Sequence, residues 1–181
     1  MSLLATSGKL TGYEVAAILR APIPLIRPVK HSQIYPALTA LEEAGDLAGQ
    51  WVEQQGRPNK KEYRLSAQGL ARLTSWLLQP RENFSQDEIL LIAYNMALIG
   101  RDAVNLALAQ FREQCDAEKR QLEERWKSAA STVPKSRLAE NGAGEKLVGI
   151  RTNYELALME RDARIAWCES VIRRAERAVF A

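Results

Sequence analysis

The sequence predicts a mainly α-helical protein with one small β-hairpin, and three observations support this fold class. Apolar residues recur at helical spacing through most of the 181 residues. Two segments typical of β-strands, residues 47–53 and 61–65, flank a tip that contains Gly56 and Pro58. Residues 81–181 combine a helical apolar pattern with charges at the intervening positions. Together these patterns predict a helical domain that carries the hairpin, followed by a domain of long helices.

The first helices are predicted from the signals at their ends. A short helix is expected to contain Leu4 and Leu10. Residues 11–14, Thr-Gly-Tyr-Glu, have the pattern of a capping box, in which the threonine hydroxyl accepts from the glutamate N–H and the carboxylate reaches back. The helix that follows should end before the prolines of residues 21–29, because proline lacks a backbone donor. Those residues are expected to form a turn or an extended connector.

The next predicted helix begins close to His31 or Ser32. It should bury Ile34 and Leu38, which are four residues apart and therefore share one face. Gly45 is expected just beyond its end, in the position that favours glycine. The opposite face is basic and rich in hydrogen-bonding side chains.

The hairpin and the helix after it have equally clear boundaries. Tyr63 should point inward from the second strand, and the tip over residues 54–60 is too long for a two-residue turn, so the hairpin should project as a wing. Ser66 is expected to cap a helix that Pro80 ends. Residues 81–84 then form a linker.

The second part of the chain is predicted to be helical throughout, apart from a break at residues 131–144. Residues 85–88, Ser-Gln-Asp-Glu, form a second capping box. Two long helices in so small a segment are not expected to bury all their apolar stripes within one chain, and antiparallel packing against a second copy would cover them. We therefore expect a dimerisation domain over residues 85–181 and a separate domain over residues 1–80.

A short helix with one apolar and one basic face, beside a hairpin with cations at its tip, is the layout of a winged helix-turn-helix. This layout predicts binding to double-stranded DNA, with the helix in the major groove. The charge distribution favours the same interpretation. Residues 1–80 hold nine Lys and Arg against six Asp and Glu, whereas residues 81–181 hold sixteen of each, so the net charge of +3 lies in the N-terminal part.

Candidate DNA contacts follow from the two elements. On the helix they are Lys30, His31, Ser32, Gln33 and Tyr35. On the wing they are Arg57, Lys60 and Lys61, which we expect to contact phosphate or the minor groove. The alternatives are that Ser32 only caps the helix, that Tyr35 packs across it, and that the wing tip is merely solvated.

Composition and motifs speak against other classes of protein. An apolar fraction of 46% and a mean hydropathy of -0.27 are typical of a soluble protein with a core. No membrane span or signal peptide is expected, which favours the cytoplasm. His31 is the single histidine and has no cluster of Cys, His or acids around it, so neither a metal site, a cofactor nor an enzyme is expected. Cys115 and Cys168 are expected to be ordinary reduced thiols.

Several of these segments resemble the PadR family of bacterial transcriptional regulators. The resemblance is carried by residues 11–14, by Ser32-Gln33-Ile34-Tyr35-Pro36-Ala37-Leu38, by residues 41–45, and by Gly56-Arg57-Pro58. It covers most of residues 10–70, and the opening and last helix of the C-terminal half resemble the longer type of this family. The first helix is shorter than the family usually has, and residues 22–28 replace a segment that is usually aromatic.

The resemblance implies a homodimeric repressor that binds a pseudo-palindromic operator. It also implies that Tyr13 touches backbone phosphate, for which a place in the core is the alternative. Some relatives respond to phenolic acids or amphipathic drugs, so Trp76, Trp126 and Trp167 are candidate walls of an effector site, with core or dimer packing as the alternative. A competing function is a helical module that uses the winged helix to bind protein.

Overall fold

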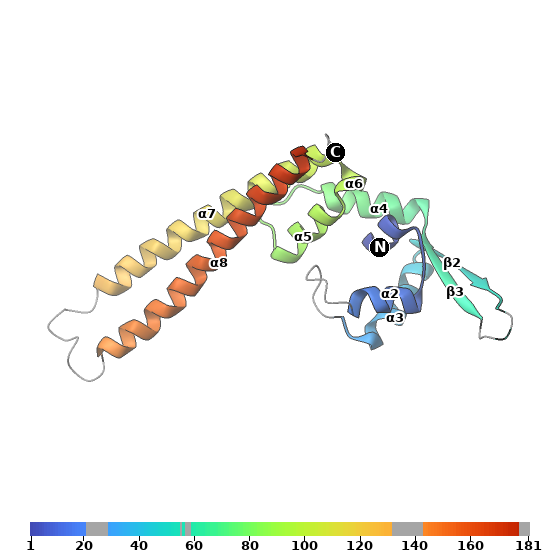
Figure 1. The fold of residues 1–181 in the computed structure, drawn as a ribbon, viewed down its shortest axis with the longest axis horizontal. Helices are drawn as coiled ribbons and strands as arrows, with labels where there is room; N and C mark the ends of the chain where they lie inside the picture. The colour runs from blue at the N-terminus through green and yellow to red at the C-terminus, as the bar shows by residue number, and fades with distance from the viewer. Residues whose placement is uncertain (21–28, 55, 57–58, 132–142, 178–181) are drawn as a thin grey trace. The chain divides into compact units, whose positions relative to one another are not determined.

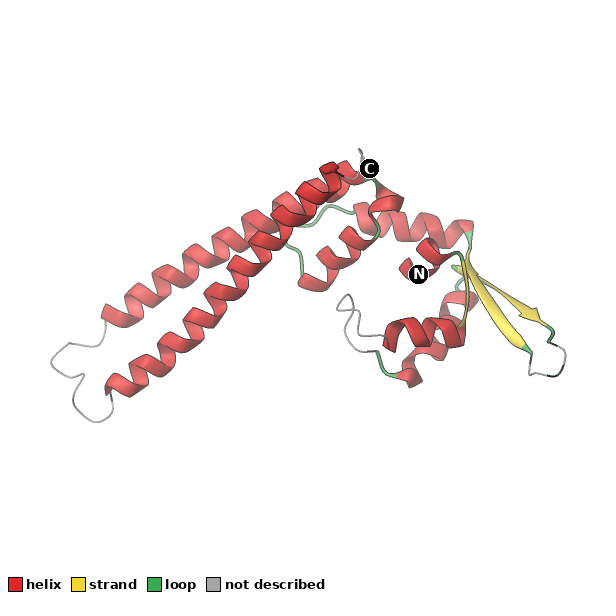
Figure 2. Ribbon diagram, in the orientation of Figure 1, coloured by secondary structure: helices red, strands yellow, loops and turns green. Residues whose placement is uncertain are grey.

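The computed structural model describes residues 1–20, 29–54, 56, 59–131 and 143–177 (Figure 1). It divides into two compact units, Met1–Val104 and Asn105–Ala181. The first unit holds α1 (Ser2–Ser7), β1 (Lys9–Thr11), α2 (Gly12–Arg20), α3 (His31–Glu43), β2 (Leu47–Val52), β3 (Lys60–Leu65), α4 (Ala67–Leu78), α5 (Gln86–Tyr94) and α6 (Met96–Ile99). The remaining helices are α7 (Arg101–Ser131), which begins in the first unit, and α8 (Ala143–Arg177). The predicted fold class is confirmed, since helices dominate and one small sheet is present (Figure 2).

The sheet has a third strand that the sequence did not predict. Its order is β1-β3-β2, with both pairs antiparallel, so that Leu10 and Gly49 lie on either side of Tyr63. The expectation that Leu10 belongs to the first helix is wrong. Gly8, at a φ of 78°, ends α1 in a conformation that only glycine adopts readily, and the chain continues as a strand.

The core of the first unit lies between the sheet and the first three helices. Its buried members are Leu4, Val15, Ala16, Ile34, Leu38, Leu47 and Tyr63. The predicted inward faces of α3 and β3 are therefore confirmed. Burial of these side chains stabilises the fold by about 2 kcal/mol each for a typical aliphatic residue, and it fixes which face of α3 is left outside.

The predicted helix ends are confirmed atom by atom. The Thr11 hydroxyl accepts from the Glu14 N–H at 3.2 Å, and the Glu14 carboxylate accepts from the Thr11 N–H at 2.7 Å. The Ser66 hydroxyl accepts from the Gly69 N–H at 2.9 Å. Gly45 follows α3 at a φ of 76°, as expected for the residue after a helix.

The junction between α3 and α4 is rigid because two backbones touch there. A Cβ on Gly69 would overlap the carbonyl oxygen of Asp46, so only glycine fits at this position of α4. The buried Asp46 carboxylate accepts from the Arg72 guanidinium at 2.7 Å, and the Asp46 carbonyl accepts from the Ser66 N–H at 3.0 Å. These contacts hold the wing strands and α4 at a defined angle to α3.

The second unit is an antiparallel pair of helices, α7 and α8, which lie side by side (Figure 1). Two ion pairs join them: Lys119 Nζ lies 2.6 Å from Asp162 Oδ1, and Arg161 Nε lies 3.1 Å from Glu118 Oε2. Cys115 and Cys168 are fully buried free thiols, one on each helix, and burial raises the pKa of Cys168 to about 11. Along the described parts of the chain, no helix is both long and apolar enough to cross a membrane.

Two sequence predictions fall partly or wholly outside the described residues. The connector expected at residues 21–29 is described only at Val29, and the break expected at residues 131–144 is described only at its edges. The functional division into residues 1–80 and 85–181 stays a prediction, because the compact units meet at Val104 instead of at the linker.

Candidate nucleic-acid interface

Helix α3 has one packed face and one open face. Ile34 and Leu38 are 3% and 5% exposed and anchor the helix to the core. On the opposite side, Ser32, Pro36 and Thr39 are exposed at successive helical turns. We call these three residues the α3 stripe. A helix that packs on the core with one face and is exposed on the opposite face meets the steric requirement for insertion into a major groove.

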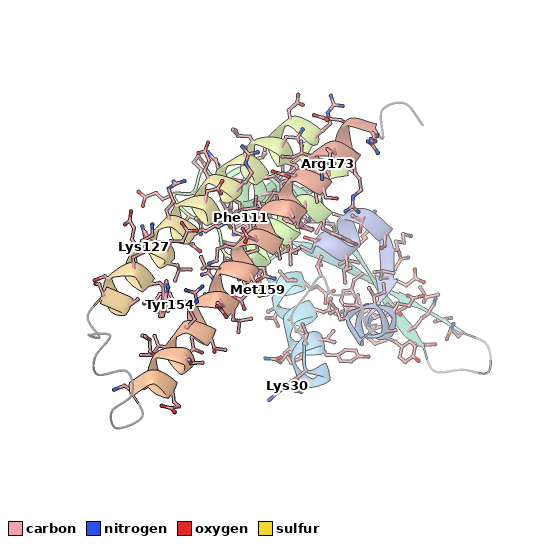
Figure 3. The ribbon with its side chains drawn as sticks, turned by 60° about the vertical axis from the view of Figure 1, so that its left-hand side comes forward. Lys30, Phe111, Lys127, Tyr154, Met159 and Arg173 are labelled. Atoms are coloured by element: carbon pink, nitrogen blue, oxygen red, sulfur yellow. The ribbon has the colours of Figure 1, made fainter. Side chains whose placement is uncertain are left out.

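The first turn of α3 is organised by Lys30 and Gln33. The Lys30 N–H donates to the side-chain oxygen of Gln33 at 3.2 Å. Gln33, which was predicted to contact DNA, therefore caps the start of α3. Lys30 is the residue before the helix, and the alternative that Ser32 caps it is therefore wrong. Figure 3 shows Lys30 at this end of α3. His31 begins the helix, and its side chain lies outside the described set.

Two tyrosines are exposed where α2 meets α3. Tyr13, in the first turn of α2, is 69% exposed, which rules out the alternative that it belongs to the core. Tyr35 is 44% exposed and lies over Gly12, where an added Cβ would be 2.7 Å from its ring carbon Cε1. One edge of the Tyr35 ring therefore packs against α2, and its contact with DNA stays a prediction. Both rings are accessible to a ligand at this junction.

The wing lysines are held in ion pairs. Lys61 Nζ lies 2.7 Å from Glu42 Oε2, and Lys60 Nζ lies 2.8 Å from Glu62 Oε1. The hydrogen bond to each carboxylate raises the pKa of each lysine. The Lys61 ammonium also lies 5.8 Å from the ring centroid of Trp51, which is 66% exposed. Arg57 lies outside the described residues. A phosphate that approaches either lysine therefore competes with a carboxylate that the lysine already contacts.

Sequence reasoning missed Pro36 and Thr39 as members of the open face. Both are exposed, and they follow Ser32 by four and seven residues, which is the helical period. The helical spacing in the sequence carries this signal, whereas the predicted contacts cover only the first turn of the helix.

The three candidate effector tryptophans have different surroundings. Trp76 lines an apolar cavity of about 460 Å³ in the first unit, and the Arg81 guanidinium lies 4.7 Å from its ring centroid. Trp126 contacts Tyr154 across α7 and α8, with ring centroids 5.7 Å apart. Trp167 is partly buried on α8. A role in effector binding stays a prediction for all three tryptophans.

Known proteins are similar to this chain. Residues 1–75 match the family described as "Transcriptional regulator PadR-like family". The negative transcriptional regulator PadR of Bacillus subtilis is 25% identical over 171 residues, which cover 93% of this chain and 91% of that protein. Two of its crystal structures, with operator DNA and with p-coumaric acid, have TM-scores of 0.41 and 0.37 at 24% identity, and cover 96% of this chain and 97% and 94% of those chains. The match to a family of regulators supports the expectation that the chain is not an enzyme.

Proposed function

Because residues 1–75 match the PadR-like family of transcriptional regulators, we propose that the chain is a member of this family and a dimeric, sequence-specific DNA-binding repressor of the cytoplasm. A small aromatic or amphipathic ligand releases it from a pseudo-palindromic operator. The observation that carries this proposal is the α3 stripe, an exposed helix face beside a hairpin and backed by a packed core. The alternative of a protein-binding winged helix has no comparable support.

The chemistry of the open face suits base readout. The hydroxyls of Ser32 and Thr39 donate to and accept from base edges, and the Thr39 methyl group fits against a thymine methyl. Lys30, at the end of α3, donates to guanine or to phosphate. We propose that Gln33 keeps its capping bond when it meets DNA and so positions the first turn.

Phosphate contacts surround this face. Tyr13 presents its hydroxyl from the first turn of α2. Lys60 and Lys61 exchange their glutamate partners for phosphate oxygens when the wing reaches DNA, because ion pairs that solvent reaches stabilise a fold only weakly. His31, Tyr35 and Arg57 complete the proposed contact set.

The surface of α8 supports dimerisation through a second copy of the chain. Val148, Leu156 and Met159 are 66%, 59% and 68% exposed, and their spacing of eight and three residues places them along one face of the helix. We call these three residues the α8 stripe, and Figure 3 labels Met159. A second copy is the occupant that also gives the two-fold symmetry of a pseudo-palindrome.

A charge in the α8 stripe tests the dimer. Met159→Glu should shift the protein to monomer in sedimentation equilibrium, because a carboxylate would be buried at the seam without a partner. Asn153→Glu is the matched control, since Asn153 is exposed but lines a small cavity with residues of α7. If both variants formed dimers as strongly as the unchanged protein does, the proposed dimer interface on α8 would be contradicted.

The DNA-binding function is tested by fluorescence anisotropy with a labelled mixed-sequence duplex over a range of salt concentrations. The logarithm of the affinity should fall linearly with the logarithm of the salt concentration, with a slope of about −0.9 for each phosphate contact. Thr39→Glu places a carboxylate in the α3 stripe and should cost at least about tenfold in affinity. Ala71→Glu, exposed on α4, is the control and should change little. Absence of binding at low salt would favour the protein-binding alternative.

A further inference from the structure

Trp51 of β2 carries an indole ring that the fold leaves largely in solvent. It is 66% exposed, whereas Trp76 is 37% exposed and Trp126 and Trp167 are partly buried. Tryptophan is a large, mostly apolar side chain that is usually well covered, and it is enriched at the centres of recognition surfaces. The DNA contacts predicted on the wing are all cations, so this ring has no role among them.

The strand register places the Trp51 ring on the face of the sheet that α3 covers. Trp51 pairs with Lys61, and Gly49, two positions earlier in β2, pairs with Tyr63. Side chains two positions apart in a strand point to the same face, and directly paired residues share that face. Tyr63 is buried in the core, and a Cβ on Gly49 would meet the carboxylate of Glu42 in α3. Trp51 therefore lies on this same face, two residues nearer the tip and beyond the last turn of α3.

Lys61 orients the Trp51 ring. Its Nζ lies 5.8 Å from the centroid of the Trp51 ring and 5.5 Å from that of Tyr63. A cation within about 6 Å of an aromatic centroid is attracted to the ring. The same ammonium is anchored to Glu42 Oε2 at 2.7 Å. The indole is thus held in one orientation before a ligand arrives, which reduces the entropy that binding it would cost.

An exposed indole beside an ammonium group suits the backbone of DNA. The ammonium group attracts a phosphate, the indole N–H is a donor for a phosphate oxygen, and the ring has a flat apolar face for the carbon atoms of a deoxyribose. The hairpin of β2 and β3 extends beyond the helices of the first unit (Figure 2). The side of the sheet that α3 covers is consequently open at Trp51, next to the end of the helix that carries the α3 stripe.

We propose that Trp51 is an uncharged contact of the wing with the DNA backbone. Its ring packs against a deoxyribose beside the groove that α3 enters, and its Nε1–H donates to the adjoining phosphate. This proposal rests on the proposed function. It adds to the lysine contacts a part of the affinity that does not depend on salt, because covering an apolar ring releases no counterion.

Two substitutions of Trp51 test the contact in the full chain. Trp51→Thr removes the ring and keeps a residue that favours strands. Anisotropy titrations with a duplex should show an affinity at least about fivefold lower at every salt concentration, with an unchanged salt slope. Trp51→Phe keeps a flat ring and should recover most of this loss. Gln50→Ala is the matched control, because Gln50 is exposed on the opposite face of the same strand, and it should change little.

Quenching of tryptophan emission by acrylamide gives a second readout, which needs no substitution in its first step. Trp51 is the most exposed of the four tryptophans, so it should dominate the quenching of the free chain, and bound DNA should protect it. This protection should be absent in Trp51→Phe. Thermal unfolding of each variant shows whether the first unit stays folded.

The possible results separate a direct contact from a structural role. A salt slope that becomes flatter by about one unit in Trp51→Thr would show that the ring acts only by holding Lys61, and would overturn the direct contact. Unchanged affinity in Trp51→Thr, or no protection from acrylamide by DNA, would overturn it as well. Failure of the unmodified chain to bind DNA at low salt would overturn the proposed function and this contact with it, whereas the other results leave the proposed function in place.

Discussion

Lys61 of β3 and Glu42 of α3 form an ion pair with Nζ and Oε2 2.7 Å apart, although they are nineteen positions apart in the sequence. The pair joins the tip end of wing strand β3 to the last turn of α3. Gly49 of β2 makes room for it, since an added Cβ would collide with both side chains. The wing and α3 are thus connected before DNA arrives, by a bond that DNA can compete for.

Lys61→Ala should weaken DNA binding for every sequence alike. If Lys61 moves from Glu42 to a phosphate, its removal lowers the slope of log affinity against log salt by about one unit. Anisotropy titrations at several salt concentrations measure this slope. An unchanged slope would remove Lys61 from the set of phosphate contacts.

Glu42→Gln should have the opposite effect on affinity with no effect on the slope. The phosphate contact stays the same, but its competitor is gone, so binding should tighten by about two- to fivefold, equivalent to a surface ion pair. Glu43→Gln removes the same charge from the same turn and is the control. A steeper slope in Glu42→Gln would show that Lys61 stays paired with Glu42 in the unmodified complex.

Tyr13→Phe should lower DNA affinity by about fivefold, the equivalent of one hydrogen bond of about 1 kcal/mol. The ring is 69% exposed, so the stability of the fold should hardly change, which thermal unfolding will show. Tyr94→Phe removes a hydroxyl that bonds to Thr6, and its DNA affinity should stay the same. Equal losses in the two variants would argue against a phosphate contact by Tyr13.

Glu88→Gln should change how stability depends on pH. Hydrogen bonds from the N–H and then the hydroxyl of Ser85 hold the pKa of Glu88 below its ordinary value of 4.5. A lowered folded-state pKa gives stability that is present above pH 4.5 and lost as the pH falls through the folded value. Glutamine keeps the hydrogen bonds and loses the charge near the helix N-terminus, so denaturant unfolding should show a loss of about 0.3–1 kcal/mol at neutral pH that shrinks in acid. Glu82→Gln, at an exposed position, is the control; a difference independent of pH would refute the assignment.

Features set by neighbouring residues could be predicted from the sequence, and contacts between distant segments could not. Both capping boxes and the inward face of α3 follow from spacings of three and four residues. Strand β1 could not be predicted from the sequence, because three residues are too few for a pattern and the strand is defined by its pairing with β3 at Tyr63. The partner of Lys61 was equally hidden, since the hairpin register and the orientation of α3 together decide it.

The apolar cavity that Trp76 lines could not be predicted from the sequence either. Trp76 was recognised as a possible wall, but the other walls come from five helices whose apolar residues look like ordinary core positions in the sequence. Gln33 has a side chain that suits a DNA contact, and only the folded first turn shows that its oxygen accepts from the Lys30 N–H. Side-chain type suggests a function, while the local backbone determines whether the group is available for it.

The most direct test of the central claim is selection of bound sites from random DNA with the purified chain. The account predicts enrichment of a pseudo-palindrome whose half-site centres are about 10 base pairs, or one turn, apart, since two copies of α3 enter successive major grooves on one side of the duplex. No enrichment above the starting pool, or a single site without two-fold symmetry, would contradict it.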